Sequence, residues 1–141
     1  MKKIKVMLDI GAYMPKRAHN TDAGYDLREK ATNSEVVRSR SSVTIDTGVH
    51  IEIPEGYVGF LKSKSGLNVR HNITSEGVID SGYTGSIIVK LYNHGDEDYI
   101  INPGDKITQL VLLPIITPEV EIVEEFKETE RGDEGFGSTG K

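Results

Sequence analysis

The chain has 141 residues, a formal net charge of -5 at pH 7 and no cysteine. This length fits one domain with a sizeable buried core, and the missing thiols exclude disulfides, a thiolate nucleophile and cysteine-bound zinc. The acidic balance argues against a broad grip on nucleic acid, although it leaves room for a small basic site that binds a phosphorylated ligand. Asp9 cuts the first apolar run too short for a signal peptide core or a membrane span. We therefore expect a cytoplasmic protein with no nucleic-acid or membrane partner.

Alternation of polar and apolar residues predicts β-strands in the first half of the chain. Residues 3–8 (KIKVML) begin with this alternation. In residues 42–53 (SVTIDTGVHIEI) it is clearer, because the valines and isoleucines all share one face. The other face carries Ser42, Thr44, Asp46, His50 and Glu52. A further strand candidate covers residues 57–62, after the turn signal IPEG.

Short strands also dominate the second half of the chain. The candidates are residues 85–92, 106–113 and 120–123, and only SGLNVRHN (65–72) suggests one short helical turn. Many short strands between glycine and proline turns indicate an all-β barrel or sandwich. Residues 106–115 (KITQLVLLPI) are apolar at nearly consecutive positions, which is typical of a strand buried on both faces. A small barrel seldom needs such a strand, so the pattern predicts a tightly associated oligomer.

The composition changes near the C-terminus, which predicts a β domain over residues 1–125 and a flexible arm over residues 126–141. The arm ends in RGDEGFGSTGK, where four glycines accompany Arg131, Phe136 and two hydroxyl side chains. Termini are often simply disordered. The alternative is a segment that closes over a ligand, because a solvated tail needs no phenylalanine.

Three segments contain residues that could carry chemistry. In GVIDSGYTG, Asp80 ends a strand of an expected hairpin, although capping the turn would also explain it. In LKSKSGLN, lysines, serines and Gly66 can contact phosphate, although lysines also protect edge strands from aggregation. In DAGYDL, Asp22 and Asp26 can hold a cation or cap turns. The sequence has no HExxH, GxSxG, Walker or GxGxxG motif.

Taken together, five segments resemble the ordered motifs of the homotrimeric dUTP pyrophosphatases (dUTPases). They are AGYDL at Ala23, SKSGL at Ser63, GVIDSGYTG at Gly77, GDKITQL at Gly104 and RGDEGFGSTG at Arg131. The resemblance implies a jelly-roll-like β-barrel, a homotrimer and three active sites between subunits. It implies an enzyme that hydrolyses dUTP to dUMP and pyrophosphate with Mg²⁺. Such an enzyme limits uracil incorporation into DNA and supplies dUMP for dTMP synthesis.

The resemblance also implies a role for individual residues. Asp80 should hold and deprotonate the water that attacks the α-phosphorus, and Tyr83 should pack on the deoxyribose and exclude a 2′-hydroxyl. Asp26 should hold Mg²⁺ through its water shell. The expected uracil-reading residues are Gly77, Val78, Ile79 and Ile88, and the expected phosphate-binding residues are Lys64, Ser65, Gly66 and Gln109. In the arm, Arg131, Phe136, Gly137 and Ser138 should cover the nucleotide.

Three residues depart from the family pattern, and two other functions compete with this one. Lys64 and Lys106 stand where arginine is common, and lysine keeps the charge but lacks the bidentate fork. Glu134 stands where a second glycine is typical. A dCTP deaminase would share the fold, but its second motif and arm differ from those seen here. A non-catalytic β module that binds a nucleotide or protein is the other alternative.

Overall fold

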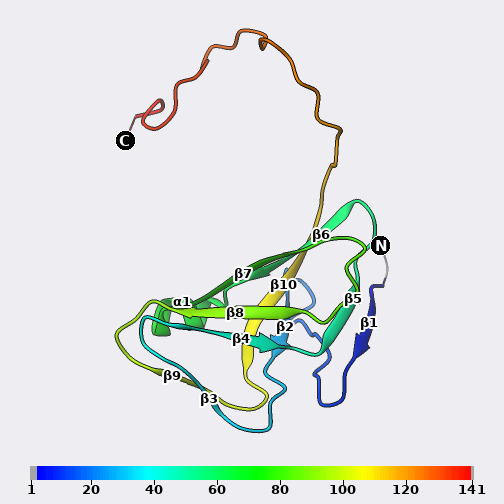
Figure 1. The fold of residues 1–141 in the computed structure, drawn as a ribbon, viewed down its shortest axis with the longest axis vertical. Helices are drawn as coiled ribbons and strands as arrows, with labels where there is room; N and C mark the ends of the chain where they lie inside the picture. The colour runs from blue at the N-terminus through cyan, green and yellow to red at the C-terminus, as the bar shows by residue number, and fades with distance from the viewer. Residues whose placement is uncertain (1–2, 141) are drawn as a thin grey trace.

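The computed structural model describes residues 3–140, and it is nearly all-β (Figure 1). The described part of the chain contains ten strands and one short helix. In chain order they are β1 (Lys5–Leu8), β2 (Gly24–Arg28), β3 (Glu35–Val37), β4 (Ser42–Asp46), β5 (Val49–Glu52), β6 (Tyr57–Lys62), α1 (Ser65–His71), β7 (Ile73–Ile79), β8 (Ile88–Asn93), β9 (Tyr99–Ile101) and β10 (Lys106–Pro114). The prediction of an all-β fold is confirmed.

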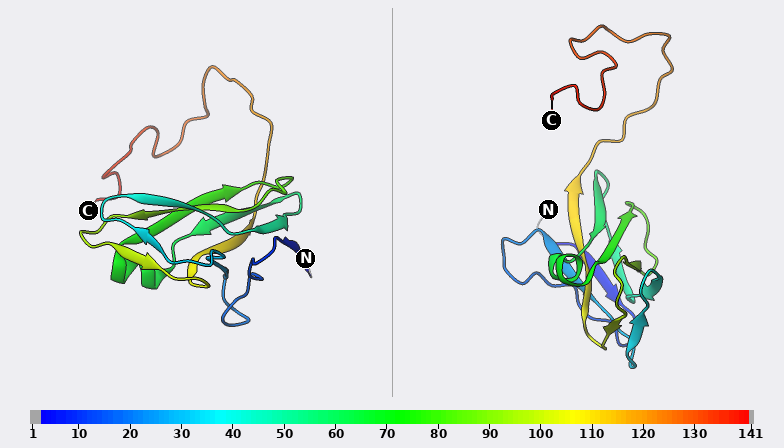
Figure 2. Two further views of the ribbon diagram at one scale, coloured as in Figure 1. Left: turned by 60° about the horizontal axis from the view of Figure 1, so that its bottom comes forward. Right: turned by 90° about the vertical axis from the view of Figure 1, so that its left-hand side faces the viewer.

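The strands form one large antiparallel sheet and two strand pairs. The large sheet has six strands in the order β2-β10-β6-β7-β8-β4, and the pairs are β1-β5 and β3-β9. Figure 2 shows that the large sheet curls, with β1-β5 and β3-β9 along its open side. The resulting half-barrel encloses a core of leucine, isoleucine and valine side chains. A Cβ at Gly59 would lie only 2.8 Å from Ile53 Cδ1, so the core packs directly against the β6 backbone.

Some strand predictions need correction. Residues 42–53 are not one strand, because the chain turns at Thr47 and Gly48, where Gly48 has a φ of 66°. As a result β4 pairs with β8, whereas β5 pairs with β1. The predicted strand at residues 120–123 is wrong for this chain on its own, since these residues have no strand structure. Three strands that the sequence pattern did not predict, β2, β3 and β9, are present.

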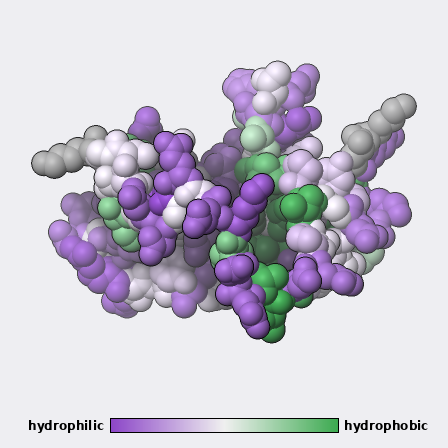
Figure 3. All heavy atoms as spheres, turned by 90° about the horizontal axis from the view of Figure 1, so that it is seen from above, coloured by the Kyte–Doolittle hydropathy of each residue, from purple (hydrophilic) through white to green (hydrophobic). Residues whose placement is uncertain are grey.

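Apolar side chains remain exposed where β10 ends and the arm begins. Leu113 is 40% exposed, Ile116 88% and Ile122 96%. Figure 3, which views the molecule from above, shows apolar side chains gathered among hydrophilic ones on part of this face. Large exposed apolar areas often mark surfaces that contact another protein. We therefore expect another copy of the chain to cover this surface.

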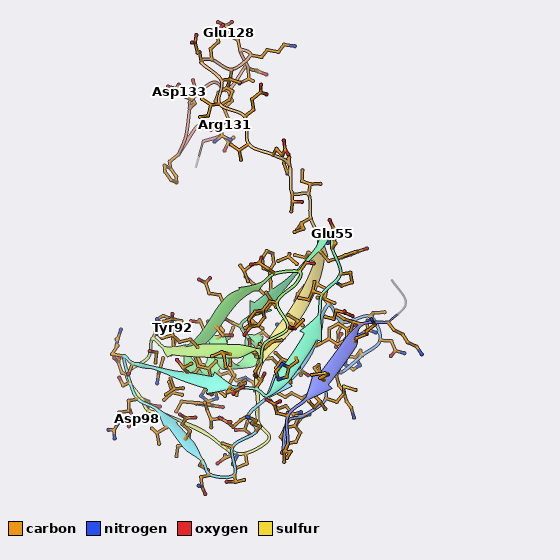
Figure 4. All side chains as sticks on the ribbon, turned by 45° about the vertical axis from the view of Figure 1, so that its right-hand side comes forward. Glu55, Tyr92, Asp98, Glu128, Arg131 and Asp133 are labelled. Carbon is orange, nitrogen blue, oxygen red and sulfur yellow. The ribbon has the colours of Figure 1, made fainter. Side chains whose placement is uncertain are left out.

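The arm runs away from the β domain (Figure 1). Arg131 and Asp133 lie far out on it, together with Glu128 (Figure 4). The hydrogen bonds within its last part are local, for example from the Arg131 side chain to the Glu134 carbonyl at 2.8 Å. Phe136 is fully exposed. The division at residue 125 stays a prediction. No helix within residues 3–140 is long and apolar enough to cross a membrane.

A pair of carboxylates, buried Glu29 and half-buried Glu35, makes stability depend on pH. Glu29 is 2% exposed, and its Oε2 atom has no hydrogen-bond partner among the described residues. Burial and the Glu29 carboxylate raise the pKa of Glu35 above its ordinary value of 4.5. The favourable contribution of Glu35 is therefore complete below pH 4.5 and is lost as the pH rises through the raised pKa.

Replacing Glu35 with Gln should stabilise the protein at neutral pH, because an uncharged amide removes the repulsion from Glu29 and donates a hydrogen bond. We expect a Tm increase of about 3 °C at pH 7, with no increase at pH 4. Thermal melting of Glu35→Gln, with Glu121→Gln in the exposed arm as the control, measures this. An equal gain at both pH values would contradict the explanation.

Candidate active site

The hairpin turn after β7 carries the predicted catalytic residue. Asp80 is exposed at the end of β7, and its carbonyl accepts a hydrogen bond from the Tyr83 N–H at 3.2 Å. The Tyr83 hydroxyl donates to the Ser86 carbonyl at 2.8 Å, so the ring folds back along the turn. A Cβ at Gly85 would lie 2.5 Å from the Tyr83 oxygen, so only glycine fits beneath the ring. The SGYTG turn therefore holds Tyr83 in one orientation beside Asp80.

Strands β7 and β8 are paired at one end only. Ile73, Thr74 and Ser75 pair with residues 91–93, and within the described chain the ladder extends no further. Had it continued, Val78 would face Ile88. Instead, the backbone of residues 76–79 is paired with β6 on one side and is free on the side that faces β8. The open hairpin thus offers main-chain N–H and C=O groups, which are strong hydrogen-bonding groups that need partners.

The hairpin is open because the corner between β4 and β5 holds β8 away from β7. The Ile87 N–H donates to the Val49 carbonyl at 2.8 Å, and the Ile87 carbonyl accepts from the Thr47 side chain at 2.7 Å. The Ser86 hydroxyl bonds to the Asp46 carboxylate, which also accepts the Gly48 N–H. Beyond the turn, Ile88 and its neighbours pair with β4. These contacts fix the width of the slot, which is the unpaired gap between residues 76–79 of β7 and the start of β8.

The predicted phosphate-binding residues lie at the other end of β7. Strand β6 leads through Ser63 into α1, and Ser65 and Gly66 are exposed at the start of that helix. The Ser63 hydroxyl accepts the Ser75 N–H at 2.9 Å, which ties this loop to the paired end of the hairpin. An exposed hydroxyl beside a glycine gives an anion close access to the backbone.

Asp26 is buried beneath this loop and pairs with two lysines. It is 5% exposed; Oδ1 contacts the Lys64 ammonium, and Oδ2 lies 3.2 Å from Lys106 Nζ. Burial raises the pKa of Asp26, but the hydrogen bonds and charges of the two lysines outweigh it, and the net pKa lies below 3.8. The formal charges of Asp26, Lys64 and Lys106 add up to +1. Both lysines stand where the resemblance expects arginine, so the substitutions act together on one carboxylate.

Gln109 lies over β2 and reaches the same loop. Its Nε2 donates to the Ser63 carbonyl at 3.0 Å, and a Cβ at Gly24 would lie only 2.1 Å from its Oε1. The glycine of AGYDL therefore makes room for Gln109. The motif resemblance implies no role for Gly24 or Gly85, although both lie inside the matching motifs AGYDL and GVIDSGYTG.

Asp26→Asn should destabilise the protein, because it leaves two ammonium groups beside a neutral amide. Losing one partner of a buried ion pair costs several kcal/mol, and since Lys64 and Lys106 are 27% and 41% exposed we expect a discounted loss of about 2 kcal/mol. The depressed pKa means that this stabilisation is present above pH 3.8 and is lost as the pH falls through the lower folded pKa.

Urea unfolding at pH 7 and pH 3 measures the Asp26 effect, with Asp22→Asn in the preceding loop as the matched control. The difference between wild type and Asp26→Asn should shrink at pH 3. A loss at pH 7 no larger than that of Asp22→Asn would show that the lysine cluster does not stabilise the fold.

The two halves of the candidate site lie apart in one chain. Ser63 is hydrogen-bonded to Ser75, whereas Asp80 lies five residues further along the chain, directly after β7. A strand rises about 3.3 Å per residue, so roughly 16 Å separate the hairpin end from the phosphate loop. The structure brings Asp26, Lys64 and Gln109 together, and it brings Asp80 and Tyr83 together with Val78 and Ile88 nearby. The predicted arm residues contact neither group.

The described chain is an antiparallel β half-barrel with an open backbone slot and a separate basic serine-glycine loop. The family model described as dUTPase matches residues 11–140. The chain therefore belongs to the dUTPase family. Among its relatives is the deoxyuridine 5′-triphosphate nucleotidohydrolase of Oryza sativa subsp. japonica, which is 42% identical over 139 residues, covering 98% of this chain and 80% of the rice protein.

Solved dUTPase structures have the same fold. The Staphylococcus bacteriophage 80alpha dUTPase with dUPNHPP has a TM-score of 0.91 and 36% identity, over 99% of both chains. A mutant dUTPase from phage phi11 of S. aureus, described with a structural Mg(II) ion, has a TM-score of 0.81 and 34% identity, over 89% of this chain and 99% of that one.

Proposed function

We propose that the protein is a dUTP diphosphatase, which hydrolyses dUTP to dUMP and pyrophosphate. The observation that carries the proposal is the open hairpin, with a free backbone edge on β7 and with Asp80 and Tyr83 at its end. Membership of the dUTPase family and the names of the relatives support the same substrate.

Uracil is read by the open hairpin. Main-chain groups of Gly77, Val78 and Ile79, with those of Ile88 across the slot, present a fixed order of donors and acceptors that uracil can match. Cytosine reverses one donor and one acceptor, so it would leave buried polar groups unpaired, at a cost of about 1–3 kcal/mol each. Tyr83, which its bond to Ser86 holds in one orientation, is in this proposal the residue that packs on the deoxyribose and excludes a ribose 2′-hydroxyl.

Asp80 acts on the water. Its carboxylate accepts a proton from the water as the oxygen attacks the α-phosphorus; the bond from that phosphorus to the bridging oxygen breaks, and pyrophosphate leaves. Asp80 is exposed in the single chain, so its main contribution is to hold the water in line with the leaving group.

The phosphates bind at the basic loop. Ser65 and Gly66 offer hydroxyl and backbone contacts, while Lys64, Lys106 and Gln109 lie around Asp26. Because both Asp26 oxygens already contact ammonium groups, a triphosphate competes with Asp26 for the lysines. Lysine binds phosphate as a point charge rather than as a fork.

Mg²⁺ belongs to the substrate in this proposal. Within residues 3–140, no three histidine, aspartate or glutamate side chains are grouped so as to hold a metal ion. Mg²⁺ is usually bound through one or two carboxylates together with substrate phosphates and waters, and in this proposal the ion arrives as the counter-ion of the triphosphate. Bound there, it neutralises charge on the phosphates. Asp26, once the lysines turn to the phosphates, is the carboxylate that faces its water shell.

A complete site requires more than one subunit. The hairpin and the phosphate loop lie at opposite ends of β7 in one chain, and apolar residues at the end of β10 and along the arm are exposed. We propose a homotrimer in which the hairpin of one copy faces the phosphate loop of another. The arm, with Arg131, Phe136, Gly137 and Ser138, then closes over the nucleotide. The cytoplasmic location stays a prediction from the sequence.

An assay of pyrophosphate release with dUTP, dCTP, UTP and dTTP in the presence of Mg²⁺ tests the function. We expect release from dUTP alone. Ammonia release from dCTP would assign the protein to the deaminases instead, and binding of dUTP without any turnover would identify a non-catalytic nucleotide-binding module.

A further inference from the structure

His50 connects the N-terminal loop to the catalytic hairpin. Its Nδ1 lies 2.7 Å from the Thr84 carbonyl oxygen, in the turn between Tyr83 and Gly85. Its Nε2 lies 3.0 Å from Asp9 Oδ1, just after β1. Both neighbours are acceptors, so both ring nitrogens must carry a proton if both hydrogen bonds are to form. Only the charged imidazolium satisfies this geometry.

The contact with Thr84 is one of the clamps that hold the hairpin open. The others, from Asp46 to Ser86 and from Thr47 and Val49 to Ile87, come from the same corner between β4 and β5. Those contacts use main-chain groups, a hydroxyl or a carboxylate with a depressed pKa. His50 is thus the clamp whose charge changes near neutral pH.

The charges around His50 favour its protonated form. Those that face it are Asp9 after β1, Asp46 at the β4 corner with Lys30 beside it, and the pair Glu52 and Lys5 on β5 and β1. Three carboxylates oppose two ammonium groups. The hydrogen bond that the ring donates to the Thr84 carbonyl raises the pKa of His50 above 6.5, burial opposes this shift, and Asp9 and Asp46 raise the pKa further.

Deprotonation of the His50 ring breaks its hydrogen bond to the Thr84 carbonyl and keeps its hydrogen bond to Asp9. The remaining N–H stays on Nε2, because a hydrogen bond to a carboxylate is stronger than one to a neutral carbonyl. Nδ1 then presents a lone pair to the Thr84 oxygen, and the two repel. A pocket beside His50, which Thr84 helps to line, gives the turn room to move.

We propose that His50 is a positioning residue for the nucleotide slot, and that its protonated ring holds the turn of Asp80 and Tyr83 in the binding geometry through the Thr84 carbonyl. The proposal rests on the proposed function of the open hairpin. The bridge is complete below pH 6.5 and is lost as the pH rises through the raised pKa of His50. Substrate binding should therefore weaken from neutral to mildly alkaline pH.

Two substitutions test the roles of the two ring nitrogens of His50 separately. The side-chain amide nitrogen of asparagine sits near the position of Nδ1, so His50→Asn keeps a donor to Thr84 that does not titrate. The side-chain amide nitrogen of glutamine sits near the position of Nε2. His50→Gln therefore keeps the hydrogen bond to Asp9 and loses the hydrogen bond to the Thr84 carbonyl. His94→Asn is the matched control, because His94 contacts Thr74 at the far, paired end of the hairpin.

Steady-state kinetics with Mg²⁺ and dUTP between pH 6 and pH 9 give the first readout. For wild type and His94→Asn we expect KM to rise about fivefold with pH while kcat changes little. A fivefold rise in KM corresponds to the loss of about one hydrogen bond. KM of His50→Asn should stay low throughout, and KM of His50→Gln should be high throughout. A pH profile of His50→Asn that follows wild type, or a low KM for His50→Gln at pH 6, would overturn the proposal.

NMR gives a readout that does not depend on catalysis. The His50 ring, identified by its loss in His50→Asn, should titrate above pH 6.5, and the amide signals of Thr84 and Gly85 should shift with the same midpoint. If the ring titrates and these amides do not follow it, the clamp does not exist. If the amide signals of Thr84 and Gly85 follow the titration of His50 but dUTP is not hydrolysed, His50 has no positioning role in dUTP hydrolysis. In that case the clamp exists and the proposed function is wrong.

Discussion

Replacing Asp80 with Asn should lower the rate of dUTP hydrolysis by about a thousandfold, within the range that general acid–base groups contribute. An amide is isosteric with the carboxylate but accepts no proton, so it cannot take one from the attacking water. Asp80 directly follows β7 on the surface and is not part of the core, so the fold should be unaffected. Binding of the nucleotide should also be kept, because the uracil slot is main chain and the phosphates bind elsewhere.

Pyrophosphate release measures the loss for Asp80→Asn, and calorimetry with the non-hydrolysable dUPNHPP measures binding. Glu55→Gln, in the exposed turn before β6, is the control for removal of a surface carboxylate and should behave as wild type. Activity within tenfold of wild type would remove Asp80 from the chemical step. A lost affinity for dUPNHPP would instead make Asp80 a binding residue.

Deleting residues 131–141 should lower kcat/KM for dUTP by about a hundredfold or more. The deletion removes Arg131 and Phe136, and with them the segment that would exclude bulk water from the closed site. Thermal melting should be unchanged, since residues 126–140 are exposed throughout and make no strand. A chain of the same length that ends in a glycine-serine sequence is the matched control, and it should be as inactive as the deletion.

Mixing the two inactive proteins tests whether the sites are shared between subunits. If Asp80 and the arm of one site come from different chains, coexpression of Asp80→Asn with the deletion should restore activity at about a quarter of the sites by random assortment. If both come from the same chain, every site lacks one of them and no activity returns. Near-normal activity of the deletion alone would refute the closing role of the arm.

The strand pattern and the ordered motifs can be read from the sequence, because both are local. A residue's face on a strand follows from its position parity, so the buried side of residues 42–53 was predicted correctly. The bend at Gly48 was not predicted, because the alternation of residues 42–53 continues through it. It depends on partners, β8 for one half and β1 for the other, that are distant in the chain.

In the arm, the sequence pattern predicts a strand that the single chain does not form. Residues 120–123 alternate as a strand does, yet in this chain they have nothing to pair with, and a strand needs a neighbour for its backbone groups. Their side chains are exposed in the structure, Val120 to 95% and Ile122 to 96%. The roles assigned to Arg131 and Phe136 stay predictions for the same reason.

The sequence by itself determined the all-β class, the family motifs and the residue types available for chemistry, because these depend on composition, local periodicity and the order of residues. Only the tertiary structure decided how those residues combine. It pairs both unusual lysines with Asp26, it separates Asp80 from the phosphate loop by most of the length of β7, and it sets His50 against the hairpin turn. None of these contacts joins neighbours in the sequence, and each depends on how strands far apart in the chain pair and curl.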